Sequence, residues 1–122
     1  MPPSQIEKYE QFKALHRADA PFVIPNPWDA GTARILSSLG FAALASTSAG
    51  CAFAAGKRDS EGVLTRDEVL ANAHAIVCAS DLPVNADLED GFWGRARGLR
   101  DLHFDGDCGR SGWWVDRGYH RA

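Results

Sequence analysis

The chain has 122 residues and a formal net charge of −3, with 45% hydrophobic and 24% charged residues. This length suits one compact domain, and the acidic balance argues against nucleic acid or a membrane surface as the main partner. No apolar run approaches the roughly 18 residues that a membrane-spanning helix needs.

The N-terminus and the cysteines together predict a cytoplasmic location. Residues 1–7 contain no basic region followed by an apolar core, so we expect no secretory signal. Cys51, Cys78 and Cys108 are odd in number and widely spaced, a pattern that fits neither a disulfide framework nor a zinc site. Free thiols in a reducing compartment are therefore expected.

Two helices and one strand are predicted over the first forty residues. Residues 4–7 have the form of a capping box, and apolar residues then recur at helical spacing, which predicts an amphipathic helix over residues 5–17. The apolar run 21–25 predicts a short strand. After it, Asp29 is placed to cap a second helix that Gly40 ends.

The next segment predicts a strand and a loop. Residues 41–45 are continuously apolar, as expected for a strand covered on both faces. Small residues at 46–50 predict a loop, and residues 51–64 are expected to form a long excursion.

A third helix and a third strand follow. A second capping box at 65–68 begins a helix that runs to about Ser80, and the run 82–86 predicts the strand after it. The apolar face of this helix is expected to comprise Val69, Leu70, Ala73, Ile76 and Val77. Strands and helices that alternate with short links predict an α/β fold with parallel strands.

Carboxylates at the end of the third expected strand carry the strongest chemical signal. Asp87, Glu89 and Asp90 lie within four residues. Strand side chains repeat every two residues, so Asp87 and Glu89 are expected to point to the same side. Adjacent carboxylates repel each other unless a cation lies between them, and Mg²⁺ needs only one or two protein carboxylates. An acidic, solvated turn is the alternative that spacing alone leaves open.

A change of composition predicts a boundary at residue 91. Residues 92–122 contain six arginines, six glycines, three of the four tryptophans and no lysine. No apolar period of 3.6 or 2 persists there. A poorly ordered tail rich in glycine and arginine is one interpretation.

Four motifs in residues 5–91 resemble a known enzyme family. They are NPWDAGTA at 26–33, STSAG at 46–50, GKRD at 56–59 and DLEDGF at 87–92. In this order and spacing they resemble the isocitrate lyase/phosphoenolpyruvate mutase superfamily, in particular members related to carboxyphosphoenolpyruvate phosphonomutase, 2-methylisocitrate lyase and oxaloacetate decarboxylase. The resemblance implies a (β/α)8 TIM barrel, of which this chain would hold the N-terminal portion with about three strands.

The resemblance also implies a reaction and a cofactor. Family enzymes make or break a C–C or P–C bond next to a 2-oxo acid through an enolpyruvate-like intermediate, with Mg²⁺ as the Lewis acid. The implied partner is a small 2-oxo acid or phosphonate. Family members are usually homo-oligomers, an assembly that we do not expect of this fragment.

Carried over position by position, the resemblance assigns site residues. Asp87 and Glu89 match the family's Mg²⁺-site acids, and Asp59 matches a catalytic aspartate near metal and substrate. The implied substrate-binding residues are Trp28, Asp29, Ser48, Ala49 and Gly50. The last three match a loop whose backbone N–H groups hold the substrate carboxylate.

Two features next to these residues also have interpretations that involve no catalytic role. Cys51 follows the carboxylate-binding loop, but a small buried hydrophobe is the expectation. Lys57 and Arg58 precede Asp59 and are expected either to attract an anionic substrate or to form a solvated pair.

Residues 92–122 have no match to the later parts of the family pattern. Reading residues 111–120 one base later allows a segment like the family's fourth-strand signature, and the same shift over 92–97 allows its continuation after the third strand. We therefore expect an out-of-frame tail after residue 91, a genuine divergent tail being the alternative. Because three strands cannot close a barrel, the fragment is expected to be inactive. A non-enzymatic small α/β binding or interaction module is the alternative function.

Overall fold

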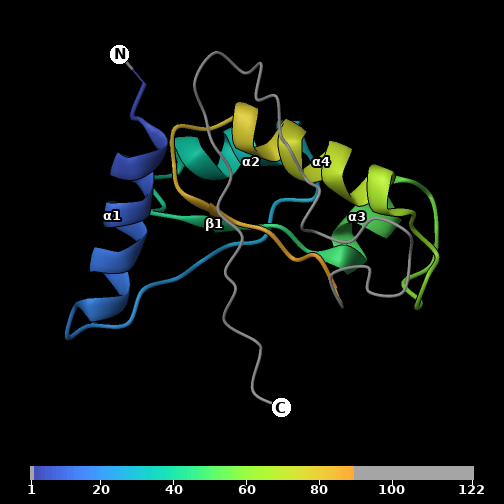
Figure 1. Ribbon diagram of the computed structural model, residues 1–122, viewed down its shortest axis with the longest axis horizontal. Coiled ribbons are helices and arrows are strands. Elements are labelled where there is room, and N and C mark those ends of the chain that lie inside the picture. Colours follow the sequence, from blue (N-terminus) through green and yellow to red (C-terminus); the bar gives the residue numbers. More distant parts are fainter. Residues whose placement is uncertain (1, 90–122) are drawn as a thin grey trace.

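The computed structural model describes residues 2–89 (Figure 1). In chain order its elements are α1 (Gln5–Arg17), α2 (Ala30–Ser38), β1 (Leu44–Ala45), α3 (Ser48–Ala54), α4 (Arg66–Cys78) and β2 (Val84–Asn85). None of these helices is long and apolar enough to cross a membrane. The boundary expected at residue 91 and the tail after it lie outside the described residues.

Side chains at the N-terminus of each long helix explain where that helix begins. At α1 the Ser4 N–H donates to Glu7 Oε2 at 2.6 Å, and the Glu7 N–H donates to Ser4 Oγ. Asp29 caps α2, as predicted, and Thr65 caps α4 through a capping box with Glu68. These contacts satisfy backbone donors that a helix leaves unpaired, so all three predicted starts are confirmed.

Glycine ends α2 because the chain turns there through the left-handed region. Leu39 is the C-cap residue, and Gly40 follows with φ of 87°. A residue with a Cβ adopts this conformation only with strain, so the predicted role of Gly40 is confirmed.

The two strands pair in parallel, which confirms the predicted α/β class. Leu44 lies opposite Val84 and Ala45 opposite Asn85. The Leu44 N–H donates to the carbonyl of Pro83 at 3.0 Å, and the Ser46 N–H donates to that of Asn85 at 2.8 Å. Figure 1 shows α2 and α4 together on one side of these strands, with α1 at one end.

The strand predicted over residues 21–25 is wrong, and the other two are shorter than predicted. The Ala45 N–H donates to the carbonyl of Pro25 at 3.1 Å, so this segment borders β1 through a single bond. Pro21 and Pro25 have no N–H to donate to a ladder. Pro83 imposes the same limit just before β2, and each assigned strand is two residues long.

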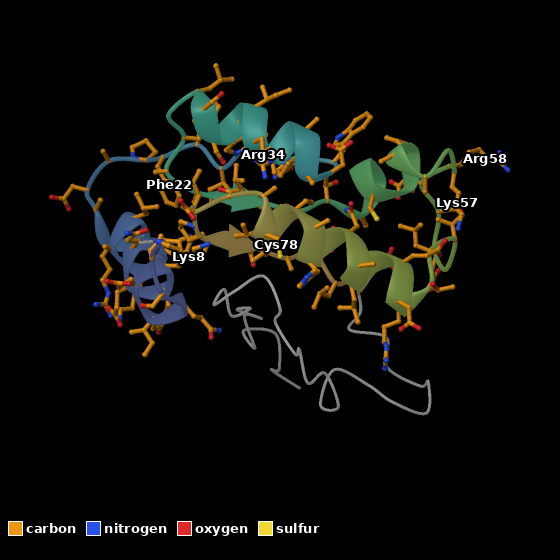
Figure 2. The ribbon with its side chains drawn as sticks, turned by 90° about the horizontal axis from the view of Figure 1, so that it is seen from above. Lys8, Phe22, Arg34, Lys57, Arg58 and Cys78 are labelled. Atoms are coloured by element: carbon orange, nitrogen blue, oxygen red, sulfur yellow. The ribbon has the colours of Figure 1, made fainter. Side chains whose placement is uncertain are left out.

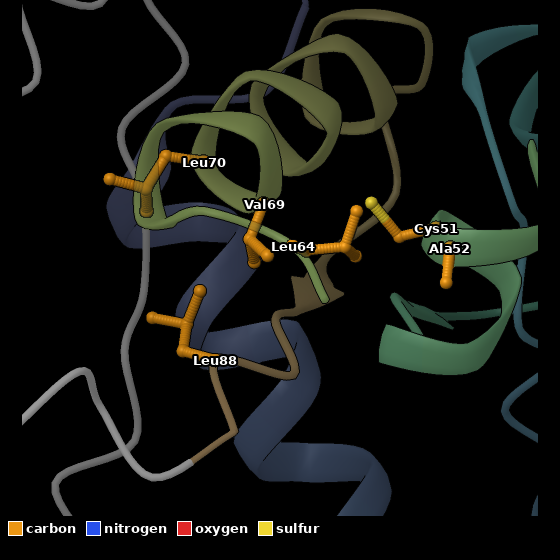
Figure 3. Packing of buried hydrophobic residues seen from close by; sticks show 6 residues of the cluster. All are labelled: Cys51, Ala52, Leu64, Val69, Leu70 and Leu88. Atoms are coloured by element: carbon orange, nitrogen blue, oxygen red, sulfur yellow. The ribbon is translucent and has the colours of Figure 1, made fainter. Parts of the chain in front are cut away.

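Two clusters of buried residues hold α4 in place. One consists of Cys51, Ala52, Leu64, Val69, Leu70 and Leu88 (Figure 3). The other joins α2, β1 and α4 through Ala33, Leu44 and Ile76. All five residues of the predicted apolar face of α4 are buried, so that prediction is confirmed. Removing the apolar surface of these side chains from water stabilises the fold by roughly 25 cal/mol per Å².

The cysteines only partly meet the expectation of free thiols. Cys51 is a free, buried thiol that packs as a small hydrophobe in the first cluster, as expected. Cys78 is disulfide-bonded, so the expectation is wrong for that residue.

A buried polar network connects four elements at the end of the molecule away from α3. Ser80 is 8% exposed, and its hydroxyl accepts from the Ser37 hydroxyl at 2.7 Å and from the Leu82 N–H at 3.0 Å. Lys8 of α1, itself 7% exposed, donates from Nζ to the Ser80 carbonyl at 3.0 Å. Burial lowers the pKa of Lys8, and the charge of Asp81 opposes that shift. Ser80 is therefore the centre that joins α1, α2 and α4 to β2.

Replacing Ser80 by alanine is expected to destabilise this junction by about 1–3 kcal/mol, because the Leu82 N–H loses its buried acceptor, while the Ser37 hydroxyl keeps its bond to the Ala33 carbonyl. Amide hydrogen exchange of Leu82 and of α4 measures the loss. Ser38→Ala is the matched control, because the exposed Ser38 hydroxyl bonds only to its own helix. Unchanged exchange at Leu82 in Ser80→Ala would contradict the role assigned to this hydroxyl.

Candidate functional site

The carboxyl ends of β1 and β2 meet, and Ser46 joins them. Ser46 follows β1, is 9% exposed, and its hydroxyl accepts from the Asp87 N–H at 2.8 Å. Its own N–H donates to the carbonyl of Asn85, the last residue of β2. The two parallel strands therefore deliver Ser46 and Asp87 to one edge of the sheet, where α/β folds place ligand sites.

The Asp87 carboxylate lies at the start of α3. Its Oδ2 accepts from the Ser48 N–H at 3.0 Å, and its Oδ1 accepts from the Glu89 N–H at 3.0 Å. Each carboxylate oxygen has two lone pairs, so each keeps one for a further ligand. Asp87 is thus fixed by backbone donors and is exposed to solvent.

Glu89 is also exposed, while Leu88 between the two acids is buried at 7%. Glu89 has φ of 53°, in the left-handed region that non-glycine residues rarely adopt. Residues 2–89 contain no cluster of three or more acids, histidines or cysteines positioned for a metal ion. Mg²⁺ prefers carboxylate oxygens and keeps several of its waters, so Asp87 and Glu89 stay the candidate ligands.

Residues 48–50 begin a helix, so the predicted loop is wrong for them. Thr47 caps α3, with its side chain accepting from the Gly50 N–H at 3.3 Å. The Ser48 N–H is bonded to Asp87. Two of the three N–H groups expected to hold a substrate carboxylate therefore already have acceptors within the chain.

Trp28 and Gly50, both predicted site residues, are brought into contact. A Cβ added at Gly50 would clash with Cδ1 of the Trp28 indole and would lie 2.7 Å from its Nε1. The indole also meets the ring of Phe53 edge-on, with centroids 5.5 Å apart. Trp28 and Phe53 are 46% and 48% exposed, so they form an aromatic wall beside α3 that faces solvent.

The carboxylate of Asp29, another predicted site residue, is directed to a cap. Its Oδ1 accepts from the Thr32 N–H at 2.8 Å and from the Thr32 hydroxyl at 2.9 Å. These bonds hold the pKa of Asp29 below its ordinary value. In this structure Asp29 fixes the start of α2, and its neighbour Trp28 provides the ring beside α3.

Asp59 lies on the exposed loop between α3 and α4. Lys57, two residues earlier, forms an ion pair with Glu68 at 2.7 Å. The described contacts do not join Asp59 to Asp87. Lys57 and Arg58 were expected either to attract an anionic substrate or to form a solvated pair. Lys57 fits neither expectation in full, because it pairs with Glu68 of the same chain.

Cys51 is a buried thiol whose pKa is raised above its ordinary value. Burial raises its pKa, and so do the negative charges of Glu68 and Glu89, while a hydrogen bond with Asn72 and the charge of Lys57 act in the opposite direction. A raised pKa keeps the reactive thiolate scarce. Glu68 and Glu89 therefore lie near enough to Cys51 for their charges to act on it.

Sequence reasoning assigned no role in the site to Ser46, Thr47, Phe53 or Glu68, although the first two belong to the 46–50 motif and Glu68 to the 65–68 capping box. The signal for Thr47 is present, since threonine before a short run of small residues is a typical N-cap. Ser46 and Phe53 act through contacts with residues far along the chain or on another element, and nothing in their immediate neighbours indicates those contacts.

Comparison with known proteins identifies relatives. The family model of phosphoenolpyruvate phosphomutase matches residues 12–102, so the match extends past residue 91. The chain is 37% identical over 80 residues to 2,3-dimethylmalate lyase of Eubacterium barkeri, covering 66% of this chain and 28% of that protein. It is 34% identical over 93 residues to 2-methylisocitrate lyase of Halalkalibacterium halodurans, covering 76% of this chain and 31% of that protein.

A solved structure supports the same relationship. A protein of Burkholderia cenocepacia J2315 described as a lyase/mutase matches with a TM-score of 0.68 and 52% sequence identity, over 72% of this chain and 31% of its own. The chain thus spans about a third of the length of these relatives.

Gly50→Ala is expected to displace the Trp28 indole, because the added methyl has no room between the indole and Thr47 Cγ2 at 2.6 Å. Overpacking of this kind costs about 1–3 kcal/mol. The NMR signal of the Trp28 indole N–H and the thermal midpoint provide the measurement.

Gly31→Ala is the matched control, because its Cβ would meet only Asp29 Oδ1 at an ordinary 3.6 Å. Equal effects of the two substitutions would contradict the close packing assigned to Gly50.

Acid is expected to weaken the junction between Lys57 and α4. Hydrogen bonds from Lys57 and from the Thr65 N–H lower the pKa of Glu68 to about 2, from 4.5. Since the folded state holds this carboxylate ionised, its contribution is present above pH 4.5 and is lost as the pH falls toward 2. The difference in stability between the natural chain and Glu68→Gln, measured by urea unfolding, should shrink over that range. A difference that stays constant with pH would contradict it.

Proposed function

Because the chain belongs to the phosphoenolpyruvate mutase/isocitrate lyase superfamily, we propose that residues 2–89 supply part of the active site of an Mg²⁺-dependent lyase or phosphonomutase. The substrate is a small 2-oxo acid or phosphonate, and the reaction passes through an enolpyruvate-like intermediate in the cytoplasm. One observation carries the proposal: the Asp87 carboxylate, at the end of β2, lies against the first N–H of α3 at 3.0 Å.

Asp87 and Glu89 hold the metal, in part through water. Their exposure leaves room for hydration, and the backbone donors at Asp87 fix its position without using every lone pair. When bound, Mg²⁺ supplies a Lewis acid that stabilises the negative charge developing on the substrate. The hydroxyl of Ser46, which accepts from the Asp87 N–H, keeps this acid at the strand end.

The substrate carboxylate is bound beside the first turn of α3. The backbone N–H groups of Ser48, Ala49 and Gly50 bind it, and those of Ser48 and Gly50 must exchange their present acceptors, Asp87 and Thr47, for the substrate. The positive end of the helix favours an anion. Trp28 with its partner Phe53 provides an apolar surface on one side of the substrate. Asp59 approaches from the loop after α3 and acts on the substrate, while Asp29 keeps Trp28 in place by capping α2.

The whole reaction requires more of the barrel than these residues contain. The chain spans 28% to 31% of the related enzymes. We extend the proposal to a (β/α)8 barrel whose first strands are in this chain, with residues 92–122 read out of frame and the chain by itself inactive. The family match as far as residue 102 counts against a change of frame at the very start of that tail. Sequencing the gene tests the frame, and the idea fails if no family segment lies one base away.

A non-enzymatic α/β module is the second candidate. It is favoured by the lack of a three-residue metal cluster within residues 2–89 and by the N–H groups of α3 that the chain itself already engages. Binding measurements separate the two candidates.

Grafting residues 1–89 in place of the matching part of 2,3-dimethylmalate lyase is expected to give an enzyme that still cleaves 2,3-dimethylmalate with Mg²⁺. Within this chimera, Asp87→Asn should lower metal affinity or activity at least about 10–100-fold, the range seen even for indirect metal partners. Manganese binding followed by electron paramagnetic resonance and oxalate binding by calorimetry give readouts besides turnover.

Asp81→Asn is the control, because Asp81 precedes β2 and lies near Lys8 rather than at the site. The same graft into the Burkholderia protein provides a second host with 52% identity. A folded chimera that binds neither Mn²⁺ nor oxalate would reject the enzyme and favour the module.

A further inference from the structure

Lys57 is anchored through its backbone at the end of α3. Its N–H donates to the carbonyl of Ala52 at 2.8 Å, and the Gly56 N–H donates to that of Phe53 at 3.0 Å. Gly56 has φ of 71°. This pair of bonds with a left-handed glycine is the Schellman arrangement that closes many helices. The position of Lys57 is therefore determined by α3.

The side chain of Lys57 is anchored at the start of α4. Its Nζ donates to Glu68 Oε1 at 2.7 Å and to the carbonyl of Val63 at 3.4 Å. The other oxygen of Glu68 accepts from the Thr65 N–H at 2.7 Å, so the acid is itself held by the first turn of α4. One residue thus joins the end of α3 to the beginning of α4.

The residues between these anchors form an exposed loop over 58–62. The Val63 N–H donates to the carbonyl of Ser60 at 3.2 Å, and Gly62 has φ of 70°. Beyond the loop, Leu64 is 1% exposed and belongs to the core. Figure 2 shows Lys57 and Arg58 at the same end of the molecule, with Arg58 extended away from the ribbon. Asp59 is two residues from Lys57, and its side chain is exposed to solvent.

We propose that Lys57 and Glu68 are positioning residues, which close the 58–62 loop and thereby fix Asp59 beside α3. The role of Asp59 rests on the proposed function, whereas the closing of the loop does not. Lys57 then does not attract an anionic substrate, because the charge of Glu68 neutralises its own. Arg58, which extends into solvent, is the residue of this pair that can still attract an anionic substrate.

The ion pair is partly exposed, with 36% and 41% of the two side chains accessible. Pairs of this kind have small energies, so a fewfold change in loop opening is expected rather than global unfolding. Cleavage before Asp59 by endoproteinase Asp-N in the full chain reports that opening, because proteolysis follows the population of the open form.

Lys57→Met should speed this cleavage about three- to fivefold, and Glu68→Gln about as much. Glutamine keeps the hydrogen bond to the Thr65 N–H, so the second substitution removes the charge and preserves the cap. Lys57→Arg, which keeps the charge, should cleave at the natural rate. In the double variant the two effects should not add, because they remove one interaction.

Glu61→Gln is the matched control, an exposed acid of the same loop that forms no ion pair within residues 2–89. Unchanged cleavage in Lys57→Met and Glu68→Gln, or equal acceleration by Glu61→Gln, would overturn the proposal.

A second readout separates the loop from the site. If Mn²⁺ binds the full chain, broadening of the Asp59 amide signal in NMR spectra should weaken in Lys57→Met, while broadening at Asp87 stays. Persistent broadening at Asp59 would overturn the positioning role. If Mn²⁺ does not bind the isolated chain, the same NMR comparison is made in the 2,3-dimethylmalate lyase chimera, and the cleavage rates decide whether Lys57 and Glu68 close the loop.

Discussion

The hydrogen bond from the Ser48 N–H to the Asp87 carboxylate is the contact on which the site end of this protein depends. It joins residues 39 apart in the chain and connects the end of β2 to the beginning of α3. The strands contribute only two paired residues each, so the sheet alone positions little beyond them. Side-chain and backbone bonds at Ser46, Ser48 and Asp87 continue the alignment past the last paired residue.

The same contact links the proposed metal site to the proposed site for the substrate carboxylate. An acid placed at the first turn of a helix is stabilised by the unpaired N–H groups there. A substrate carboxylate bound beside α3 would therefore share those donors with Asp87. The proposed metal site and the proposed anion site are consequently neighbours that depend on one set of backbone groups, which the bonds of Ser46 and Thr47 hold in place.

Local chemistry made the helices predictable, and long-range pairing made the strands less so. Ser4 with Glu7, Asp29 with Thr32 and Thr65 with Glu68 act within three residues, so the sequence pattern contains the whole interaction. The prediction of a strand over 21–25 was wrong because Pro21 and Pro25 lack the N–H groups that pairing with a neighbouring strand requires. In the site, Asp87 and Trp28 follow from motifs, but the Gly50–Trp28 contact and the Lys57–Glu68 pair arise from tertiary packing.

The close fit of Trp28 against Gly50 has an evolutionary consequence. The space that a side chain at residue 50 would need is filled by a ring that comes from the other side of β1 in the chain. A lineage can therefore gain a larger side chain at position 50 only after position 28 has lost its large one. Sequence variation at these two positions is therefore expected to be correlated, with the small residue and the large one exchanging places or disappearing together.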